Sequence, residues 1–330
     1  MKTTGKILKW IGIIFSLVII GFFLFVQFSW DKKFHALYPD IKSNSDSASI
    51  ERGMHLAFGP AHCATCHIPM DKILAVEEGL KMPLIGGWEL PIPPGTFRAP
   101  NITPDIETGI GNMSDGAIAR VLRYSVNRND GIVFAFMPFQ ELSDDDLTAI
   151  ISFLRSQESV KNMVEPSKLS FLGKALMALG FIKPVGPINT PPKSVVIDTT
   201  ATYGSYLAKS VGNCIGCHSE INMMTGALLE PHYAGGTPFP ADVFSMGYSF
   251  ISPNLTPHKE TGVIANWDEK TFITRFHAGR VIKGSPMPWG AFSKMYDSEL
   301  KALYRFFQSL DPVENKIAKT VFNPDEKLPK

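Results

Sequence analysis

The sequence predicts an all-α protein in which a single N-terminal transmembrane helix precedes two copies of one helical module. Three observations lead to this fold class. A long uncharged stretch lies near the N-terminus, the rest of the chain repeats itself at an offset of about 150 residues, and few segments show the period-two alternation of strands. The length of 330 residues fits two domains, and a hydrophobic content of 45% is enough to build buried cores.

The first element is an apolar stretch that runs from Trp10 to Trp30 without a charged residue. As a helix, its 21 residues would be roughly 31 Å long, which matches a hydrocarbon thickness of ~30 Å, and a Trp marks each end. A cleaved signal peptide is the alternative, but its apolar core would be only about 7–15 residues long, and no small-x-small cleavage pattern follows Val26. We therefore expect an anchor at 10–30 and, from a small excess of lysine before it, a cytoplasmic tail at 1–9.

The internal repeat defines the two modules. Three stretches align in order at offsets of 151, 153 and 150 residues: RGMHLAFGPAHCATCH at 52–67 with YGSYLAKSVGNCIGCH at 203–218, APNITPDIETGIG at 99–111 with SPNLTPHKETGVI at 252–264, and FMPF at 136–139 with PMPWG at 286–290. The expected organisation is a linker at 31–48, a first module at 49–160, a second linker at 161–200, a second module at 201–312 and a C-terminal tail at 313–330.

Each module is expected to end in an amphipathic helix. In the first module, Ser143 and Asp146 have the S-x-x-D spacing of a capping box, and apolar residues follow on one helical face from Leu147. In the second module, Asp297 is expected to cap a helix with the same apolar face from Leu300. These faces predict core contacts.

Between these helices lie Gly- and Pro-rich stretches at 86–95 and 235–242, which are not expected to continue a helix or a central strand. The second linker contains an amphipathic run at 167–181, which could lie on the membrane surface or pack between the modules. Four prolines at 183–193 then predict an extended chain.

All four cysteines belong to two C-x-x-C-H pentads, CATCH at 63–67 and CIGCH at 214–218. A zinc site usually brings two such pairs within ~15–20 residues, whereas Cys66 and Cys214 are 148 positions apart. A thioredoxin-like dithiol needs a βαβ context, which is missing, and has no use for the following His. C-x-x-C-H is the attachment pattern of c-type haem, in which both sulfurs form thioethers and the His ligates iron. The expected haem-binding residues are Cys63, Cys66, His67, Cys214, Cys217 and His218.

The second axial ligand of each iron is expected to be a methionine. Met137 follows His67 by 70 residues, Met287 follows His218 by 69, and a Pro comes directly after each Met. Methionine is also a common core filler, but these two occupy matching positions in both copies. The remaining histidines, His62 among them, have no counterpart in the other copy and are not assigned to iron. Four arginines are candidates for pairing with haem propionates: Arg98, Arg123, Arg275 and Arg280.

With these motifs, the chain resembles a class I cytochrome c and, more narrowly, the membrane-bound dihaem cytochromes c related to the cytochrome c subunits of bacterial alcohol and gluconate dehydrogenases. The two pentads, the N-[IL]-T-P-x-x-x-T-G stretches at 101–109 and 254–262, and the Met-Pro turns carry the resemblance. It implies two tandem class I cytochrome c domains, in which the first and last helices cross at Gly53 and Gly204. Dehydrogenase subunits of this kind commonly carry three haems, whereas this chain has two motifs.

The expected function is therefore single-electron transfer by a membrane-anchored dihaem carrier rather than an enzyme, because iron held by His and Met has no open position for a substrate. It would have two covalently attached haem c groups on the periplasmic side of the inner membrane. Its expected partners are a periplasmic dehydrogenase or quinol-oxidising complex as donor, and a terminal oxidase or soluble cytochrome as acceptor. A net charge of +1 gives no reason to expect nucleic-acid binding. The alternatives are a dihaem peroxidase-like enzyme and a membrane-docking cytochrome subunit of an alcohol or sugar-acid dehydrogenase.

Overall fold

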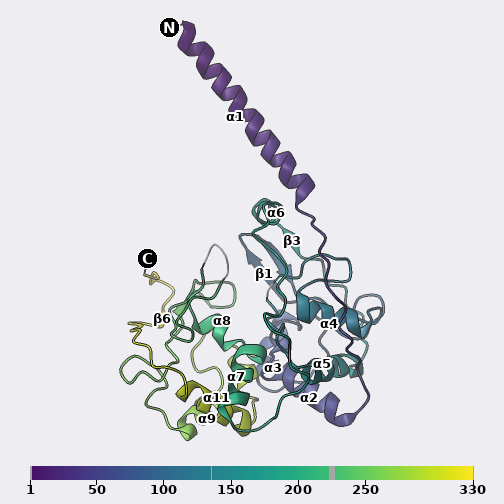
Figure 1. Ribbon diagram of the computed structural model, residues 1–330, viewed down its shortest axis with the longest axis vertical. Helices are drawn as coiled ribbons and strands as arrows, with labels where there is room; N and C mark the ends of the chain where they lie inside the picture. Colours follow the sequence, from purple (N-terminus) through teal and green to yellow (C-terminus); the bar gives the residue numbers. More distant parts are fainter. Residues whose placement is uncertain (1, 135, 223–226, 330) are drawn as a thin grey trace.

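The computed structural model describes residues 2–134, 136–222 and 227–329 and has a long helix that leads away from a folded body (Figure 1). This helix is α1 (Lys2–Ser29), which begins eight residues before the expected span at Trp10. Its segment Gly5–Ser29 is long and apolar enough to cross a membrane, and most of its side chains contact nothing else in the chain. Length and composition thus agree with a membrane span at this position.

The first half of the body is built around two crossing helices. Its helical elements are α2 (Ser47–Phe58), η1 (Cys63–Thr65), η2 (Met70–Lys72), α3 (Ile73–Glu77), α4 (Asp115–Tyr124) and α5 (Asp144–Ser156). The expected crossing is confirmed, since a Cβ on Gly53 of α2 would lie only 1.9 Å from the carbonyl oxygen of Ala149 in α5. The expected cap is also present, because the Ser143 hydroxyl accepts a hydrogen bond from the Asp146 amide.

The second half repeats this arrangement. Its helical elements are α7 (Ala201–Tyr206), the π-helical turn η3 (Leu207–Val211), α8 (Cys214–His218), α9 (Glu269–His277), α10 (Trp289–Phe292) and α11 (Asp297–Gln308). A Cβ on Gly204 of α7 would lie 1.9 Å from the carbonyl oxygen of Ala302 in α11, the same close approach as in the first half. The cap differs from expectation, because Asp297 is the first helical residue and the Glu299 carboxylate accepts from the Tyr296 amide instead.

The described residues are mostly helical, as expected, and also contain two small antiparallel sheets that the all-α prediction did not include. One sheet consists of β1 (Glu89–Ile92), β2 (Gly95–Arg98) and β3 (Lys168–Leu169), and the other of β4 (Pro238–Phe239), β5 (Ser249–Ile251) and β6 (Val321–Phe322). Strands of two to four residues are too short to show an alternating pattern. The third strand of each sheet comes from beyond the module's last helix, so the chain folds back over the half it has just completed.

The helix of the second linker packs against α1 and not between the two halves, so the second of its two expected placements is wrong. This helix, α6 (Phe171–Ala178), lies beside the end of α1, where Val26 is fully buried against Ala175 and Ala178 (Figure 1). The Pro-rich part that follows runs past the start of α5, where the Asp144 amide donates to the Pro192 carbonyl.

Candidate functional site

The first C-x-x-C-H pentad forms a tight turn that leaves its histidine almost fully buried. Cys63 begins the short helix η1, and His62 before it adopts a left-handed conformation with φ of 43°. The Nδ1–H of His67 donates to the Pro100 carbonyl at 2.8 Å, since a carbonyl can only accept. Nδ1 thus carries the proton and Nε2 the lone pair, and no hydrogen bond is made at Nε2 within the described residues. The ring is oriented as a metal ligand would be.

The second pentad repeats this geometry. Asn213 before it is left-handed with φ of 49°, and Cys214 begins α8. The Nδ1–H of His218 donates to the Pro253 carbonyl at 3.1 Å, and Nε2 again has no hydrogen-bond partner in the described part of the chain. The structure therefore builds the same histidine environment twice, from segments related by the repeat.

The two prolines whose carbonyls orient the histidines were not identified from the sequence. Each comes directly before the N-[IL]-T-P stretch that the two copies share. In the first copy, the Asn101 side-chain amide donates to Thr108 at 3.0 Å and to the Val160 carbonyl at 2.8 Å, and its oxygen accepts from the Thr103 hydroxyl at 2.8 Å. This network fixes the loop that begins at Pro100. The shared N-[IL]-T-P motif was therefore the sequence signal from which the role of the Pro100 carbonyl could have been predicted.

The second copy has the same network. The Asn254 amide donates to Thr261 at 3.1 Å and to the Val313 carbonyl at 2.8 Å, and its oxygen accepts from the Thr256 hydroxyl at 2.7 Å. Because Asn254 and Val313 are far apart in the sequence, the loop is held against the segment that follows the last helix. The network thereby holds the loop that begins at Pro253.

A close backbone approach at a glycine completes each histidine environment. The Gly86 amide donates to the His67 carbonyl at 2.9 Å, and the Gly235 amide donates to the His218 carbonyl at 2.8 Å. Both glycines have positive φ, and a Cβ on Gly86 would lie 2.5 Å from the Pro100 carbonyl carbon. Only glycine permits this backbone to pass so close to the carbonyl that orients the ring.

The two expected methionine ligands occupy equivalent irregular segments. Met137 lies between α4 and α5, and Met287 lies between α9 and α10. Both are partly buried and pack on the same hydrophobic core as Cys63 and Cys214. Each methionine is therefore a neighbour of the core that its pentad borders.

Burial controls the charge state of the pentad side chains. It lowers the pKa of His67 and His218, which keeps both imidazoles neutral at pH 7 despite the carbonyl that accepts from them. It raises the pKa of Cys63, Cys66 and Cys214 to about 12. Redox-active cysteines need a lowered pKa, so these thiols do not have the environment of a redox-active dithiol.

A zinc site would also need its ligands to converge. Among the described residues, no group of three or more His, Cys, Asp or Glu side chains could hold a metal ion. Each half instead provides a neutral imidazole and a pair of thiols. None of these four cysteines is in a disulfide. This donor set fits a prosthetic group attached through sulfur and ligated through Nε2.

The four candidate arginines do not share one environment. Three pair with carboxylates: Arg98 with Glu89, Arg123 with Asp144 and Arg280 with Glu77. The guanidinium of Arg275 instead lies 3.6 Å from the centre of the Trp289 ring, and burial lowers its pKa. Among the four, Arg275 is the one whose cation has no carboxylate partner in the described residues.

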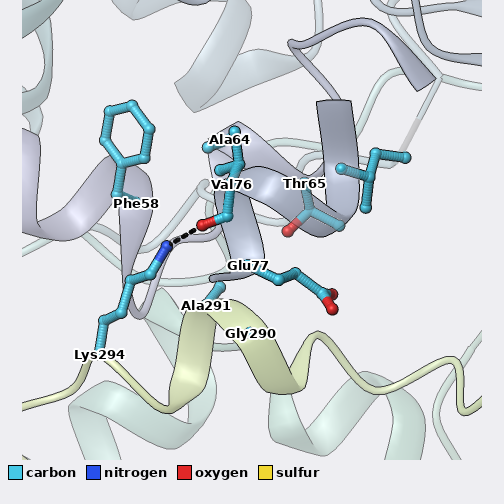
Figure 2. A pocket seen from close by; sticks show the side chains of 9 residues that line it. Phe58, Ala64, Thr65, Val76, Glu77, Gly290, Ala291 and Lys294 are labelled. Atoms are coloured by element: carbon cyan, nitrogen blue, oxygen red, sulfur yellow. Dashed lines mark hydrogen bonds between the residues drawn. The ribbon is translucent and has the colours of Figure 1, made fainter. Parts of the chain in front are cut away.

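The first pentad lies next to the segment that follows Met287 (Figure 2). A small pocket between the halves is lined by Phe58, Ala64, Thr65, Ile73, Val76 and Glu77 from the first half, and by Gly290, Ala291 and Lys294 from the second. Across it, the Lys294 ammonium donates to the Val76 carbonyl at 2.5 Å. A Cβ on Gly290 would lie 2.2 Å from Cγ of Glu77, so the two halves are in direct contact at the wall of this pocket.

A buried ionic network joins the halves at their first helices, and sequence reasoning did not identify it. Arg52 pairs with Asp146 of its own half, Nε to Oδ1 at 2.9 Å, and with Glu299 of the other half, Nη1 to Oε1 at 3.0 Å. The other Glu299 oxygen lies 2.8 Å from Nε2 of His55. The side chain of Glu299 is fully buried, so it depends on these partners for its charge.

The network follows the internal repeat by position but not by residue type. At the repeat offset of 151, Arg52 and His55 correspond to Tyr203 and Tyr206. The Tyr206 hydroxyl donates to Oδ2 of Asp146 at 2.8 Å, just as His55 contacts Glu299. Each half thus contacts the last helix of the other half from its first helix.

Comparisons with known proteins agree with this geometry. Residues 50–158 match the model of the cytochrome c family, so the chain contains a cytochrome c domain. It is homologous to cytochrome c subunits of dehydrogenases. It is 28% identical to the cytochrome c subunit of the quinone alcohol dehydrogenase of Gluconobacter oxydans, over 82% of this chain and 56% of that one. It is 25% identical to the gluconate 2-dehydrogenase cytochrome c subunit of Pantoea cypripedii, over 90% and 66%.

A third relative is named as a dihaem protein. The chain is 27% identical to a "diheme cytochrome c-type" protein of Cereibacter sphaeroides, over 61% of this chain and 66% of that one. The chain spans about half the length of the quinone alcohol dehydrogenase subunits that it matches.

Proposed function

We propose that this protein is a membrane-anchored dihaem electron carrier. The cytochrome c domain that it contains implies covalently bound haem c. The two halves, 49–160 and 201–312, would be tandem class I cytochrome c domains joined by the linker at 161–200. One haem would be held by Cys63, Cys66, His67 and Met137, and the other by Cys214, Cys217, His218 and Met287. When bound, each haem iron supplies a one-electron Fe(III)/Fe(II) couple.

The observation that carries this proposal is the histidine environment, which occurs twice. In each half, a carbonyl accepts the Nδ1 proton and leaves Nε2 as the donor atom, and two free cysteines precede the ring. The second half lies outside the family match at 50–158. Its assignment rests on its having the same hydrogen bonds, the same crossing at glycine and the same Met-Pro turn.

The chain's own groups would favour electron transfer over catalysis on a substrate. The Nδ1 hydrogen bond holds each imidazole in one tautomer and orientation, and the apolar core limits access of water. A thioether ligand from Met137 or Met287 would occupy the remaining axial position and favour the reduced state. A peroxidase needs one axial position open beside an acid-base group, and a methionine in both copies argues against that alternative.

Electrons would pass between the two sites within one chain. The first pentad is next to the segment that follows Met287, and the ring of Phe292 contacts His62 with centroids 5.7 Å apart. The Arg280–Glu77 ion pair and the Lys294 hydrogen bond hold this contact. Short separation and fixed orientation are what transfer between two carriers requires.

The partners and location follow from the relatives and from α1. The names of the relatives place such chains beside quinone alcohol dehydrogenase and gluconate 2-dehydrogenase, so we propose a periplasmic dehydrogenase of alcohols or sugar acids as donor. The acceptor would be a terminal oxidase or a soluble cytochrome. Helix α1 would anchor the chain in the inner membrane, with both haem domains on the periplasmic side.

The test uses the full chain matured in a host that attaches haem c. Intact mass should exceed the polypeptide mass by two haems, and the spectrum of the reduced protein should not change when carbon monoxide is added. Met137→Ala and Met287→Ala should each create one site that binds carbon monoxide. Met163→Leu is the matched control, because that methionine is 74% exposed.

Two results would overturn the proposal. A mass equal to the bare polypeptide, or to one haem, would remove the dihaem assignment. Carbon monoxide binding by the unaltered protein would mean an open iron and would favour an enzyme.

A further inference from the structure

The second linker contains an apolar helix whose surface is only partly covered. Helix α6 buries Ala175 and Ala178 against α1. Other large apolar side chains in and after it are exposed: Phe171 by 45%, Leu172 by 48%, Leu179 by 51% and Phe181 by 59%. An exposed apolar cluster of this kind beside a membrane helix is expected to be covered by lipid or by another protein.

The contacts of α6 with α1 show at which level of the apolar span of α1 the helix α6 lies. The ring of Phe171 stacks on Phe23, with centroids 5.5 Å apart, and meets Phe22 edge-on at 6.3 Å. Phe22 is seven residues before Ser29, the end of the helix, which corresponds to about 10 Å along the axis. Phe22 and Phe23 lie inside the apolar span of α1. The start of α6 contacts them and therefore lies at the same depth.

Two lysine contacts lie at the other end of this depth range. The Lys32 ammonium donates to the Ala178 carbonyl at 2.9 Å, and the Lys174 ammonium lies 5.0 Å from the centre of the Trp30 ring. Tryptophan and lysine are the residues that concentrate at the boundary between lipid and water. Trp30 and Lys32 therefore mark the membrane surface, and Phe171 lies below it.

We propose that α6 is embedded in the outer leaflet of the membrane beside α1, with Phe171, Leu172, Leu179 and Phe181 in contact with phospholipid acyl chains. This inference rests on the proposed function in one respect, since it requires that α1 remains as an anchor. The contact of Val26 with Ala175 and Ala178 exists only while α1 is retained, because removal of α1 would expose both alanines to water.

Helix α6 would then fix the first half of the body against the membrane. A Cβ on Gly173 would lie 2.0 Å from the Pro94 carbonyl oxygen, so α6 packs tightly on the turn between β1 and β2. The Ser170 hydroxyl donates to the Pro93 carbonyl at 2.7 Å, and the Ser170 amide donates to the Pro94 carbonyl at 2.9 Å. The first half is thus attached to the membrane helix by packing as well as by the chain.

The test is photolabelling of the full, haem-containing chain in phosphatidylcholine vesicles that contain a phospholipid with a diazirine on its acyl chain. Mass spectrometry should find lipid adducts on α1 and also within 171–181. The control residues are Ile188 and Val196, which are apolar and exposed by 92% and 78% but lie further along the linker. They should carry no adduct, because they are in water.

A variant sharpens this test. Leu172→Glu should lower labelling within 171–181 several-fold, since a carboxylate is expelled from the acyl-chain region, and should leave labelling of α1 unchanged. Val196→Glu, the matched control, should change neither.

Two results would overturn the inference: adducts on α1 with none within 171–181, or a mature protein whose mass lacks α1. The readout does not depend on electron transfer. A chain with two haems and an unlabelled α6 would refute this inference alone, whereas a labelled α6 in a chain without haem would refute only the proposed function.

Discussion

At the scale of single residues, the chemistry of each site depends on a backbone carbonyl. His67 and His218 are identified by the pentad, but the tautomer that leaves Nε2 free to act as a ligand is chosen by the Pro100 and Pro253 carbonyls. Those carbonyls are held in turn by Asn101 and its equivalent Asn254. The asparagines are therefore positioning residues for the histidines.

We expect Asn101→Ala to lower the free energy of unfolding by about 1–3 kcal/mol, because it leaves the amide of the buried Thr103 without its acceptor. The midpoint of urea unfolding measures this effect. Asn129→Ala, at an exposed position in the same half, should leave the midpoint unchanged. An equal midpoint for Asn101→Ala would mean that the network does not hold the loop.

At the scale of helices, each half depends on one close crossing. The backbones of α2 and α5 touch at Gly53, and those of α7 and α11 touch at Gly204. A side chain at either glycine would separate the helices that enclose the core. The crossing sets the angle and spacing between the first and last helix of each half.

We expect Gly204→Val to destabilise the second half by more than 3 kcal/mol, because its Cβ would overlap the Ala302 carbonyl and cannot be moved aside by a side-chain rotation. Haem incorporation and the thermal unfolding midpoint measure it. Gly12→Ala is the control, since a Cβ there would meet nothing within 4 Å in the protein. Normal haem content and an unchanged midpoint in Gly204→Val would contradict the crossing.

At the scale of the whole molecule, the halves form one unit because their ionic network is shared. Burial alone would raise the pKa of Glu299, but its hydrogen bond from His55 and the nearby charges of His55 and Arg52 outweigh burial and hold the pKa below its usual value. A carboxyl with a depressed pKa stabilises the folded state above its ordinary pKa and loses this contribution as the pH falls through the lowered value. The contact between the halves should therefore weaken in acid.

We expect Glu299→Gln to cost about 3–5 kcal/mol at pH 7, because it leaves Arg52 with one buried partner in place of two. Urea midpoints at pH 7 and near pH 4 measure it, and the difference between wild type and variant should shrink at the lower pH. Glu78→Gln, at an exposed position, should show no difference at either pH. A difference that grows in acid would reverse the assigned sign.

The sequence was informative wherever the chemistry is local or repeated. The spacing of two cysteines and a histidine defines each pentad within five residues, and the repeat assigned Met137 and Met287 to equivalent positions because both copies keep a Met-Pro turn. The long apolar helix α1 follows from an uncharged run, and the crossings at Gly53 and Gly204 followed from the resemblance. Apart from the crossings, each of these conclusions needs only residues that are neighbours in the chain or partners in the repeat.

Tertiary structure alone decided the contacts between distant residues. The sheets form because β3 and β6 return from beyond each module's last helix, and strands so short are stable only when another segment pairs with them. Helix α6 was ambiguous in sequence because an apolar face does not specify its partner, which proved to be α1. Glu299 reads as an ordinary surface carboxylate until folding removes it from water and brings Arg52 and His55 to it from 247 and 244 residues away. Sequence by itself determined the pentads and the matching Met-Pro turns, and the fold determined which carbonyls, charges and apolar surfaces surround them.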